Sequence, residues 1–190
     1  METALHPYQE IILDDLRPLL VLAGPVEGDF FRCVSEKYAH DFISGEGARL
    51  HGGRWNGKGL FRAVYLSDSP ETALGEFLAR ARRMNVSMAG EMPMVMAAVR
   101  MKMQRVLDVN EAAVSAILQP LLASERDHWR RAQQTHETVS QAVGRAGQEL
   151  GLQGLRANSE SVPGGRNLII FPDALSKNDL LALSKSRIPP

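Results

Sequence analysis

The stretch GEGARLHGGRWNGKGLFRAVYLSDSPETALGE, residues 45–76, decides how this chain is expected to fold. Six glycines fall in its first fifteen residues, and Arg49 and Arg54 stand among them. Glycine allows positive φ angles and a close approach of backbone N–H groups to a ligand, and arginine supplies planar donors that match phosphate or carboxylate oxygens. The loop therefore favours an anionic ligand. A solvated turn explains the same pattern. Two known phosphate-loop patterns are absent: GxxxxGK followed by serine or threonine, and GxGxxG at the start of a helix.

A strand and a helix are predicted directly after this loop. Residues 60–66 form an apolar run, and the Ser-Pro-Glu sequence at 69–71 combines an N-cap, a proline at the first helical position and an acid in the first turn. At about 100° per residue, Glu76 falls on the flank of the apolar stripe of this helix. That position suits a carboxylate facing a cleft, and it also suits a surface glutamate paired with Arg80 one turn later.

Four separated motifs in the right order resemble the signature of the RES domain family, over roughly residues 30–172. They are FFRCV, the segment GARLHGGRWNGKG with a tyrosine eleven residues after its second arginine, the helix after that tyrosine, and GLRANSESVPGGRNLIIFP. The residues that correspond to the family's functional positions are Arg32, Arg54, Tyr65, Glu76 and Ser159. Ser161 lies so close to Ser159 that either could be the family's serine.

The resemblance implies an α+β fold similar to that of ADP-ribosyltransferases: split, mostly antiparallel β-sheets with flanking helices and a central cleft. Short strands and helices that alternate without a regular βαβ order also favour the α+β class. RES proteins are known as NAD⁺-consuming toxins that an antitoxin with an Xre-like helix-turn-helix neutralises. The resemblance therefore implies cleavage of the nicotinamide–ribose bond of NAD⁺, with a cognate inhibitor that plugs the cleft.

The acceptor of the ADP-ribose stays open at this point. Inorganic phosphate would make the chain an NAD⁺ phosphorylase, water a glycohydrolase, and a protein side chain a mono-ADP-ribosyltransferase. Degradation of free NAD⁺ is favoured, because no long loop for docking a protein substrate is present. Two other classes also remain: a module that binds a nucleotide without turnover, and an interaction protein that uses the Gly-Arg loop as an epitope.

The resemblance also implies roles for the charged residues. Glu76 would stabilise the positive charge that develops on the ribose as nicotinamide leaves. Arg32 and Arg54, with Arg49 as a weaker candidate, would bind the pyrophosphate. Arg32, at the end of an apolar strand, could instead be a structural ion-pair partner.

The two remaining candidates, Tyr65 and Ser159, are polar and uncharged. Tyr65 would stack on the nicotinamide or ribose and offer its hydroxyl, although a tyrosine inside a strand is by default a core aromatic. Ser159 would bond to a ribose or to the nicotinamide amide, or it could simply form a turn.

Composition limits the remaining choices. A chain of 190 residues, 44% hydrophobic and 23% charged, is long enough for a single domain with a real core. A net charge of zero gives no general field for nucleic acid, and the one cysteine, Cys33, excludes an internal disulfide and a cysteine-based zinc site. We predict no metal and no cofactor apart from NAD⁺ as substrate. With no signal peptide and no apolar run near eighteen residues, we expect a cytoplasmic protein without a membrane span.

The rest of the chain completes this unit. The apolar pattern predicts a helical N-terminal extension over residues 1–28, which ends in a turn at Gly24-Pro25 and serves packing or an oligomer contact. The resemblance implies a RES domain over residues 29–190. Further strands are expected at 30–34, 93–101, 106–109, 154–157 and 167–171, and further helices at 112–118, 135–150 and 175–185.

Overall fold

The structure is a computed structural model that describes residues 9–87, 90, 92–123 and 129–188, and it shows a mixed α+β fold. Within these residues, six strands form one hydrogen-bonded sheet in the order β1-β2-β5-β4-β3-β6, and β1 also pairs with β3. The strands are β1 (Gly24–Ser35), β2 (Val64–Ser67), β3 (Met94–Asp108), β4 (Gly154–Asn158), β5 (Arg166–Ile170) and β6 (Leu180–Ile188).

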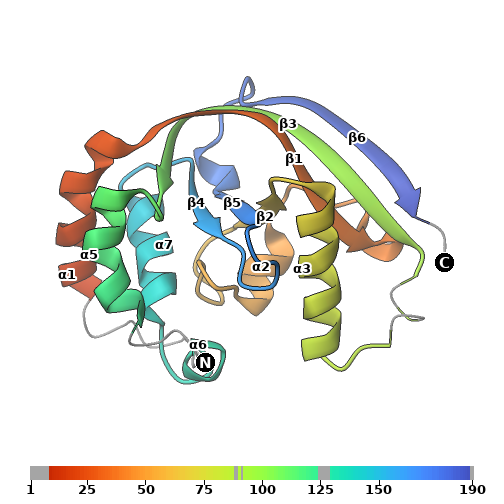
Figure 1. The fold of residues 1–190 in the computed structure, drawn as a ribbon, viewed down its shortest axis with the longest axis horizontal. Coiled ribbons are helices and arrows are strands. Elements are labelled where there is room, and N and C mark those ends of the chain that lie inside the picture. The colour runs from red at the N-terminus through yellow and green to blue at the C-terminus, as the bar shows by residue number, and fades with distance from the viewer. Residues whose placement is uncertain (1–8, 88–89, 91, 124–128, 189–190) are drawn as a thin grey trace.

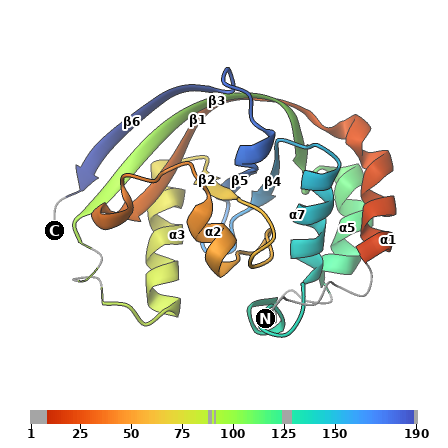
Figure 2. The ribbon, with the colours of Figure 1, turned by 180° about the vertical axis from the view of Figure 1, so that it is seen from behind.

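The long strands β1 and β3 run side by side and arch over the short strands β2, β4 and β5, as Figures 1 and 2 show from opposite sides. The described pairings are antiparallel except that of β3 with β4, so the expected mostly antiparallel arrangement is observed. β1 meets β2 only where Phe31 lies opposite Ser67. This pair places the middle of β1 next to the end of β2.

The helices gather at two ends of the sheet. α1 (Gln9–Leu16), α5 (Ala112–Ala123) and α7 (Val139–Glu149) lie at one end, and α3 (Pro70–Arg83) lies at the other (Figure 1). The shorter elements are α2 (Glu46–His51), α6 (Trp129–Ala132) and the 3-10 turns η1 (Arg17–Leu22), η2 (Glu36–Tyr38) and η3 (Pro172–Ala174).

The helix start that the sequence predicts at residues 69–71 is confirmed. The Ser69 hydroxyl accepts a hydrogen bond from the Thr72 backbone N–H at 3.1 Å, and Pro70 is the first helical residue. This cap fixes where the helix that carries Glu76 begins.

Three apolar clusters hold the elements together. The largest packs α1, α5 and α7 against β4 and β5, and a second fills the space between β1 and β3 on one side and β2 and β5 on the other. The third packs α3 on β1 through Phe77 and Cys33, both buried. Because α3 is packed on β1, the element that carries Glu76 is held against the one that carries Arg32.

Several predicted boundaries are wrong. Gly24 and Pro25 open β1 instead of forming a turn, so the helical part of the N-terminal segment ends at η1. Residues 94–108 form one strand where two were expected, because β3 pairs with β1 along nearly its whole length. The strand expected at 60–66 covers only 64–67. Residues 1–8 lie outside the described residues, and the division of the chain at residue 28 stays a prediction.

The final helix expected at 175–185 is also wrong. Residues 180–188 form the edge strand β6, which pairs with β3 from Met94 to Met101. A short leucine-rich segment such as this one fits either period, and the free edge of β3 decides for the strand. Among the described helices, none has the length and apolar character needed to cross a membrane.

Candidate functional site

Glu76 lies on α3 with its carboxylate enclosed by three side chains from distant segments. The Ser159 hydroxyl and the Asn167 amide nitrogen donate to Oε1 at 2.6 and 2.9 Å, and the Ser161 hydroxyl donates to Oε2 at 2.8 Å. The Ser67 hydroxyl of β2 donates to Oδ1 of Asn167 at 2.9 Å, which turns the amide nitrogen of Asn167 towards the glutamate. The pairing of Glu76 with Arg80 that the sequence left open is not the contact found.

These donors also set the charge of Glu76. Burial by itself would raise the pKa of this half-buried carboxyl, but the hydrogen bonds from Ser159, Asn167 and Ser161 and the positive charge of Arg83 outweigh it. The pKa of Glu76 therefore lies below its ordinary value. The group is ionised at neutral pH, so it can stabilise a positive charge but is a weak general base.

The two serines belong to the loop between β4 and β5. Besides bonding to Glu76, the Ser159 hydroxyl accepts from the backbone N–H groups of Ser161 and Val162, at 3.1 and 2.9 Å. Ser159 thus forms the expected turn and also contacts the carboxylate, and its bond to a ribose or to the nicotinamide amide stays a prediction. A Cβ at Gly75 would lie 2.3 Å from a methyl carbon of Val162, so glycine at this position lets the serine loop approach α3.

Tyr65 holds the glycine-rich segment of residues 45–59, here called the Gly-rich loop. Its hydroxyl accepts from the Trp55 backbone N–H at 2.9 Å and donates to Oδ1 of Asn56 at 2.7 Å, and the Asn56 amide nitrogen donates to the Ala48 carbonyl at 2.8 Å. Burial raises the pKa of Tyr65, so the hydroxyl stays protonated. The described contacts therefore place this hydroxyl inside the loop's own hydrogen-bond network.

Helix α7 supports the same loop from the other side. The Gln141 amide nitrogen donates to the Gly53 carbonyl at 2.9 Å. A Cβ at Gly144 would lie only 1.7 Å from the Trp55 carbonyl oxygen, so the helix and the loop touch backbone to backbone. Arg54 is therefore held between two anchored neighbours.

Arg54 connects the Gly-rich loop to the serine loop. Its guanidinium lies 3.3 Å from Oε1 of Glu160, and its Cζ lies 5.2 Å from the ring centroid of Trp55. Glu160 stands between the two serines that bind Glu76. The structure thus brings Arg54 next to Glu76 and its three hydrogen-bond donors, here called the Glu76 cluster, and Glu160 is the residue in between.

Arg32 approaches from the β1 side. It is half-buried and donates to the Phe42 carbonyl, and within the described residues it forms no ion pair with a carboxylate. Burial first, then the nearby charge of Arg80, lowers the pKa of Arg32 to about 10, and Asp41 opposes this shift. Phe31 pairs with Ser67, the residue whose side chain bonds to Asn167. Arg32 is the next residue of β1 after Phe31.

No described contact joins Arg49 to Glu76 or to the side chains that bond to it. The guanidinium of Arg49 pairs with Glu46 one turn earlier in α2, and its side chain is 39% exposed.

Sequence reasoning did not assign roles to Ser67, Asn167, Glu160 or Arg83, whose Nη1 donates to Ser161 Oγ at 3.2 Å. Only Asn167 gave a signal, as part of the GG-x-N ending after the serine.

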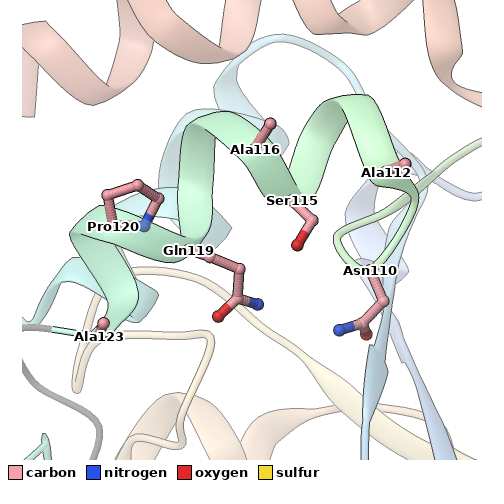
Figure 3. A pocket seen from close by; sticks show the side chains of 7 residues that line it. All are labelled: Asn110, Ala112, Ser115, Ala116, Gln119, Pro120 and Ala123. Atoms are coloured by element: carbon pink, nitrogen blue, oxygen red, sulfur yellow. The ribbon is translucent and has the colours of Figure 1, made fainter.

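A surface pocket of about 650 Å³ lies along α5. Figure 3 shows Ser115 and Gln119 of α5 directed to the side on which Asn110 lies. None of the candidate residues lines this pocket, but Asn110 accepts a hydrogen bond from the Asn158 backbone N–H at 2.8 Å, directly before the serine loop. Among the described residues, no group of three or more His, Cys, Asp or Glu side chains could hold a metal ion.

Comparison with known proteins gives three results. The model of the family described as the RES domain matches residues 29–184. Two curated relatives, each named NAD(+) phosphorylase MbcT, from Mycobacterium tuberculosis (strain ATCC 25618 / H37Rv) and Mycobacterium bovis (strain ATCC BAA-935 / AF2122/97), are 39% identical over 89 residues. The match covers 46% of this chain and 45% of each relative, so the chain spans less than half the length of the curated relatives it matches.

The third result concerns the fold. A solved structure described as the crystal structure of the M. tuberculosis MbcT-MbcA toxin-antitoxin complex superimposes with a TM-score of 0.75. It shares 22% sequence identity and covers 94% of this chain and 92% of the other. The likeness shows that the two chains share a fold.

Proposed function

The chain belongs to the RES domain family, and from that premise we propose that it is a toxin that consumes NAD⁺ by cleaving the nicotinamide–ribose bond, as a phosphorylase or glycohydrolase. The names of its relatives support this proposal. The observation that carries it is the Glu76 carboxylate, held ionised by three donors beside the segments that bear Arg54 and Arg32.

An ionised carboxylate is what this reaction needs. The nicotinamide ring of NAD⁺ is positively charged and leaves as a neutral molecule, so the leaving group requires no proton. The positive charge passes to the ribose, which becomes oxocarbenium-like in the transition state. Glu76, fixed in one orientation by Ser159, Ser161 and Asn167, would stabilise that charge without having to reorganise.

The two arginines would bind the pyrophosphate. Arg32 carries a half-buried charge without a carboxylate partner among the described residues, and a bound phosphate oxygen would supply that partner. Arg54 would turn from Glu160 to the substrate, since the two side chains are each about a quarter exposed. Arg49 remains a weaker candidate, because it would have to leave Glu46 to reach the ligand.

Tyr65 and Ser159 would act mainly by positioning. Tyr65 would keep the Gly-rich loop, and so Arg54, in place, while its ring face meets the nicotinamide or ribose. Ser159 would hold the carboxylate and bond to a ribose hydroxyl or the nicotinamide amide.

The finer architecture belongs to the same proposal. β1, β3 and β6 would form one sheet of an ADP-ribosyltransferase-like fold and β2, β5 and β4 the other, with NAD⁺ in a cleft between them. The short joins between the two sets, at Phe31–Ser67 and along Val106–Asp108, support this division. We also propose a cytoplasmic protein, a RES domain over residues 29–190, no metal, and a possible homo-oligomer.

The proposed partner is a cognate Xre-like antitoxin, because an active NAD⁺ consumer would deplete its own host. Its acidic or C-terminal groups would occupy Arg32 and Arg54 in place of the pyrophosphate, and the toxin itself would make no direct contact with nucleic acid.

The test is to incubate the purified chain, verified by mass to be free of a bound partner, with NAD⁺ in the presence and absence of inorganic phosphate. We expect nicotinamide with ADP-ribose 1″-phosphate or ADP-ribose, and much slower release by Glu76→Gln. ADP-ribose attached to a protein would instead show a mono-ADP-ribosyltransferase. Binding of NAD⁺ without any nicotinamide release would leave only a nucleotide-binding module.

A further inference from the structure

Arg83 is the cation joined most directly to the Glu76 cluster, apart from the residues already assigned. Its Nη1 donates to Ser161 Oγ at 3.2 Å, and the same serine oxygen donates to Oε2 of Glu76 at 2.8 Å. Arg83 follows Glu76 by seven positions, so both lie on the same face of α3, two turns apart. The contact therefore joins the last turn of α3 to the serine loop.

The two oxygens of Glu76 meet different surroundings. Oε1 accepts from Ser159 and Asn167, and this side continues through Ser67 into the sheet. Oε2 accepts from Ser161, and this side continues to the exposed side chain of Arg83. A small anion that arrives from solvent can reach the second side, where a hydroxyl and a guanidinium already stand next to each other.

The charge of Glu76 favours an anionic acceptor over water. A water molecule must lose a proton to a base as it attacks, and a carboxylate held by three donors with a lowered pKa is a poor base. A phosphate dianion is already a nucleophile and needs no such base. It does need a cation, because it must approach a carboxylate of the same sign.

We infer that Arg83 and Ser161 form the binding site for the acceptor of the reaction, an inorganic phosphate dianion. This inference rests on the proposed cleavage of NAD⁺. A phosphate oxygen forms a bond to C1″ of the ribose as the bond from C1″ to the nicotinamide nitrogen breaks, and nicotinamide leaves with the electron pair of that bond. The products are ADP-ribose 1″-phosphate, neutral nicotinamide and the proton of the monohydrogen phosphate, which passes to solvent.

Arg83 is distinct from its two basic neighbours. Arg80 lies over the Phe77 ring, at 5.7 Å from the ring centroid, and Arg82 donates to the Leu78 carbonyl of its own helix. Arg82 is exposed like Arg83 and carries the same charge, but no described contact joins it to the serine loop. Arg82→Gln is therefore the matched control for Arg83→Gln.

The experiment measures nicotinamide release while phosphate and NAD⁺ are varied separately, and it resolves the products by mass. We expect Arg83→Gln to raise the KM for phosphate about tenfold or more, with the KM for NAD⁺ changed less than twofold and a larger share of ADP-ribose among the products. Arg83→Lys should recover part of the loss, and Arg82→Gln should behave as the wild type. Calorimetric titration with inorganic phosphate alone should show weaker binding to Arg83→Gln at an unchanged melting temperature.

Four results would overturn the assignment. They are an unchanged KM for phosphate in Arg83→Gln, an equal loss in Arg82→Gln, a rise in the KM for NAD⁺ that places Arg83 on the pyrophosphate instead, and phosphate-independent release of ADP-ribose by the wild type. The last result would leave NAD⁺ cleavage standing. No nicotinamide release under any condition would overturn both this inference and the proposed function.

Discussion

At the scale of single residues, the proposed chemistry depends on the charge state of Glu76. Three neutral donors and Arg83 keep the carboxylate ionised in spite of its burial. The same contacts have a consequence for stability. Because the folded-state pKa is lowered, they stabilise the fold above the unfolded pKa of the carboxyl, and this contribution is lost as the pH falls through the folded pKa.

Glu76→Gln should remove the negative charge while keeping the shape of the side chain. We expect kcat for nicotinamide release to fall by about 100-fold to 1,000-fold, because a charge that stabilises the transition state is lost, while NAD⁺ still binds. Steady-state kinetics and calorimetric binding measure the two effects. Equal activity of Glu76→Gln and wild type would remove Glu76 from the mechanism.

Asn167→Ala should shift the pH profile. The wild-type rate should stay constant as the pH falls towards the lowered pKa of Glu76 and then decline, since only the ionised carboxylate is active. Without the Asn167 amide, one donor to the charged form is lost and the pKa of Glu76 rises. The acid limb of kcat against pH should therefore move to higher pH, and an unmoved limb would contradict the assignment of that limb to Glu76.

Glu160→Gln should improve substrate binding. In the structure Arg54 is paired with Glu160, and we expect a neutral residue at 160 to release the guanidinium for the pyrophosphate. The KM for NAD⁺ should fall by about 1.5-fold to fivefold, the range of a partly exposed ion pair. Glu71→Gln, at an exposed site in the first turn of α3, provides the control with the same change in charge. A raised KM in Glu160→Gln would mean that Glu160 itself contacts the substrate.

At the scale of helices and strands, the sequence predicted those features that hydrogen bonds between neighbouring residues determine. The cap of α3 follows from the Ser-Pro-Glu sequence, because its hydrogen bond forms within four residues. The strand β6 could not be predicted in this way, since the free edge of β3, some eighty residues earlier in the chain, makes that segment extended. The same holds for the candidate site. The motif resemblance predicted Glu76 and Ser159, but the bond from Ser67 to Asn167 depends on the pairing of β2 with β5.

Gly144→Ala tests the support of the Gly-rich loop by α7. The added methyl would overlap the Trp55 carbonyl oxygen, and two backbones cannot both keep their positions. We expect a loss of about 1 to 3 kcal/mol in the free energy of unfolding and a raised KM for NAD⁺, because Arg54 moves with Trp55. Gly147→Ala in the same helix is the control, since its Cβ would meet side-chain atoms and no backbone, the nearest being in the flexible side chain of Leu152 at 3.2 Å. Denaturant unfolding and kinetics of the two variants separate the effects, and equal behaviour would show that the loop adjusts without cost.

At the scale of the whole molecule, segments far apart in the chain enclose one carboxylate. The serine loop, the start of β5 and the last turn of α3 contact Glu76 directly or through one residue, and β1 joins them through Phe31 and Ser67. No single segment contains the site. The sequence could show that the parts resemble those of a known family, but their convergence is a property of the folded chain.

The N-terminal helix takes part in this whole, although the family match begins only at residue 29. Leu16 of α1 is fully buried in the cluster that contains α5, α7 and the inner strands, whereas Val21 in η1 is 85% exposed. We expect Leu16→Ala to cost about 2 to 5 kcal/mol and to lower the melting temperature by roughly 5 to 15 °C, while Val21→Ala stays near the wild type. Because α7 carries Gln141 and Gly144, which hold the Gly-rich loop, the loss of its packing against α1 should also raise the KM for NAD⁺ in Leu16→Ala. A Leu16→Ala variant that melts and turns over like the wild type would show instead that the helical segment is an appendage, and that the residues from 29 onwards hold the site without it.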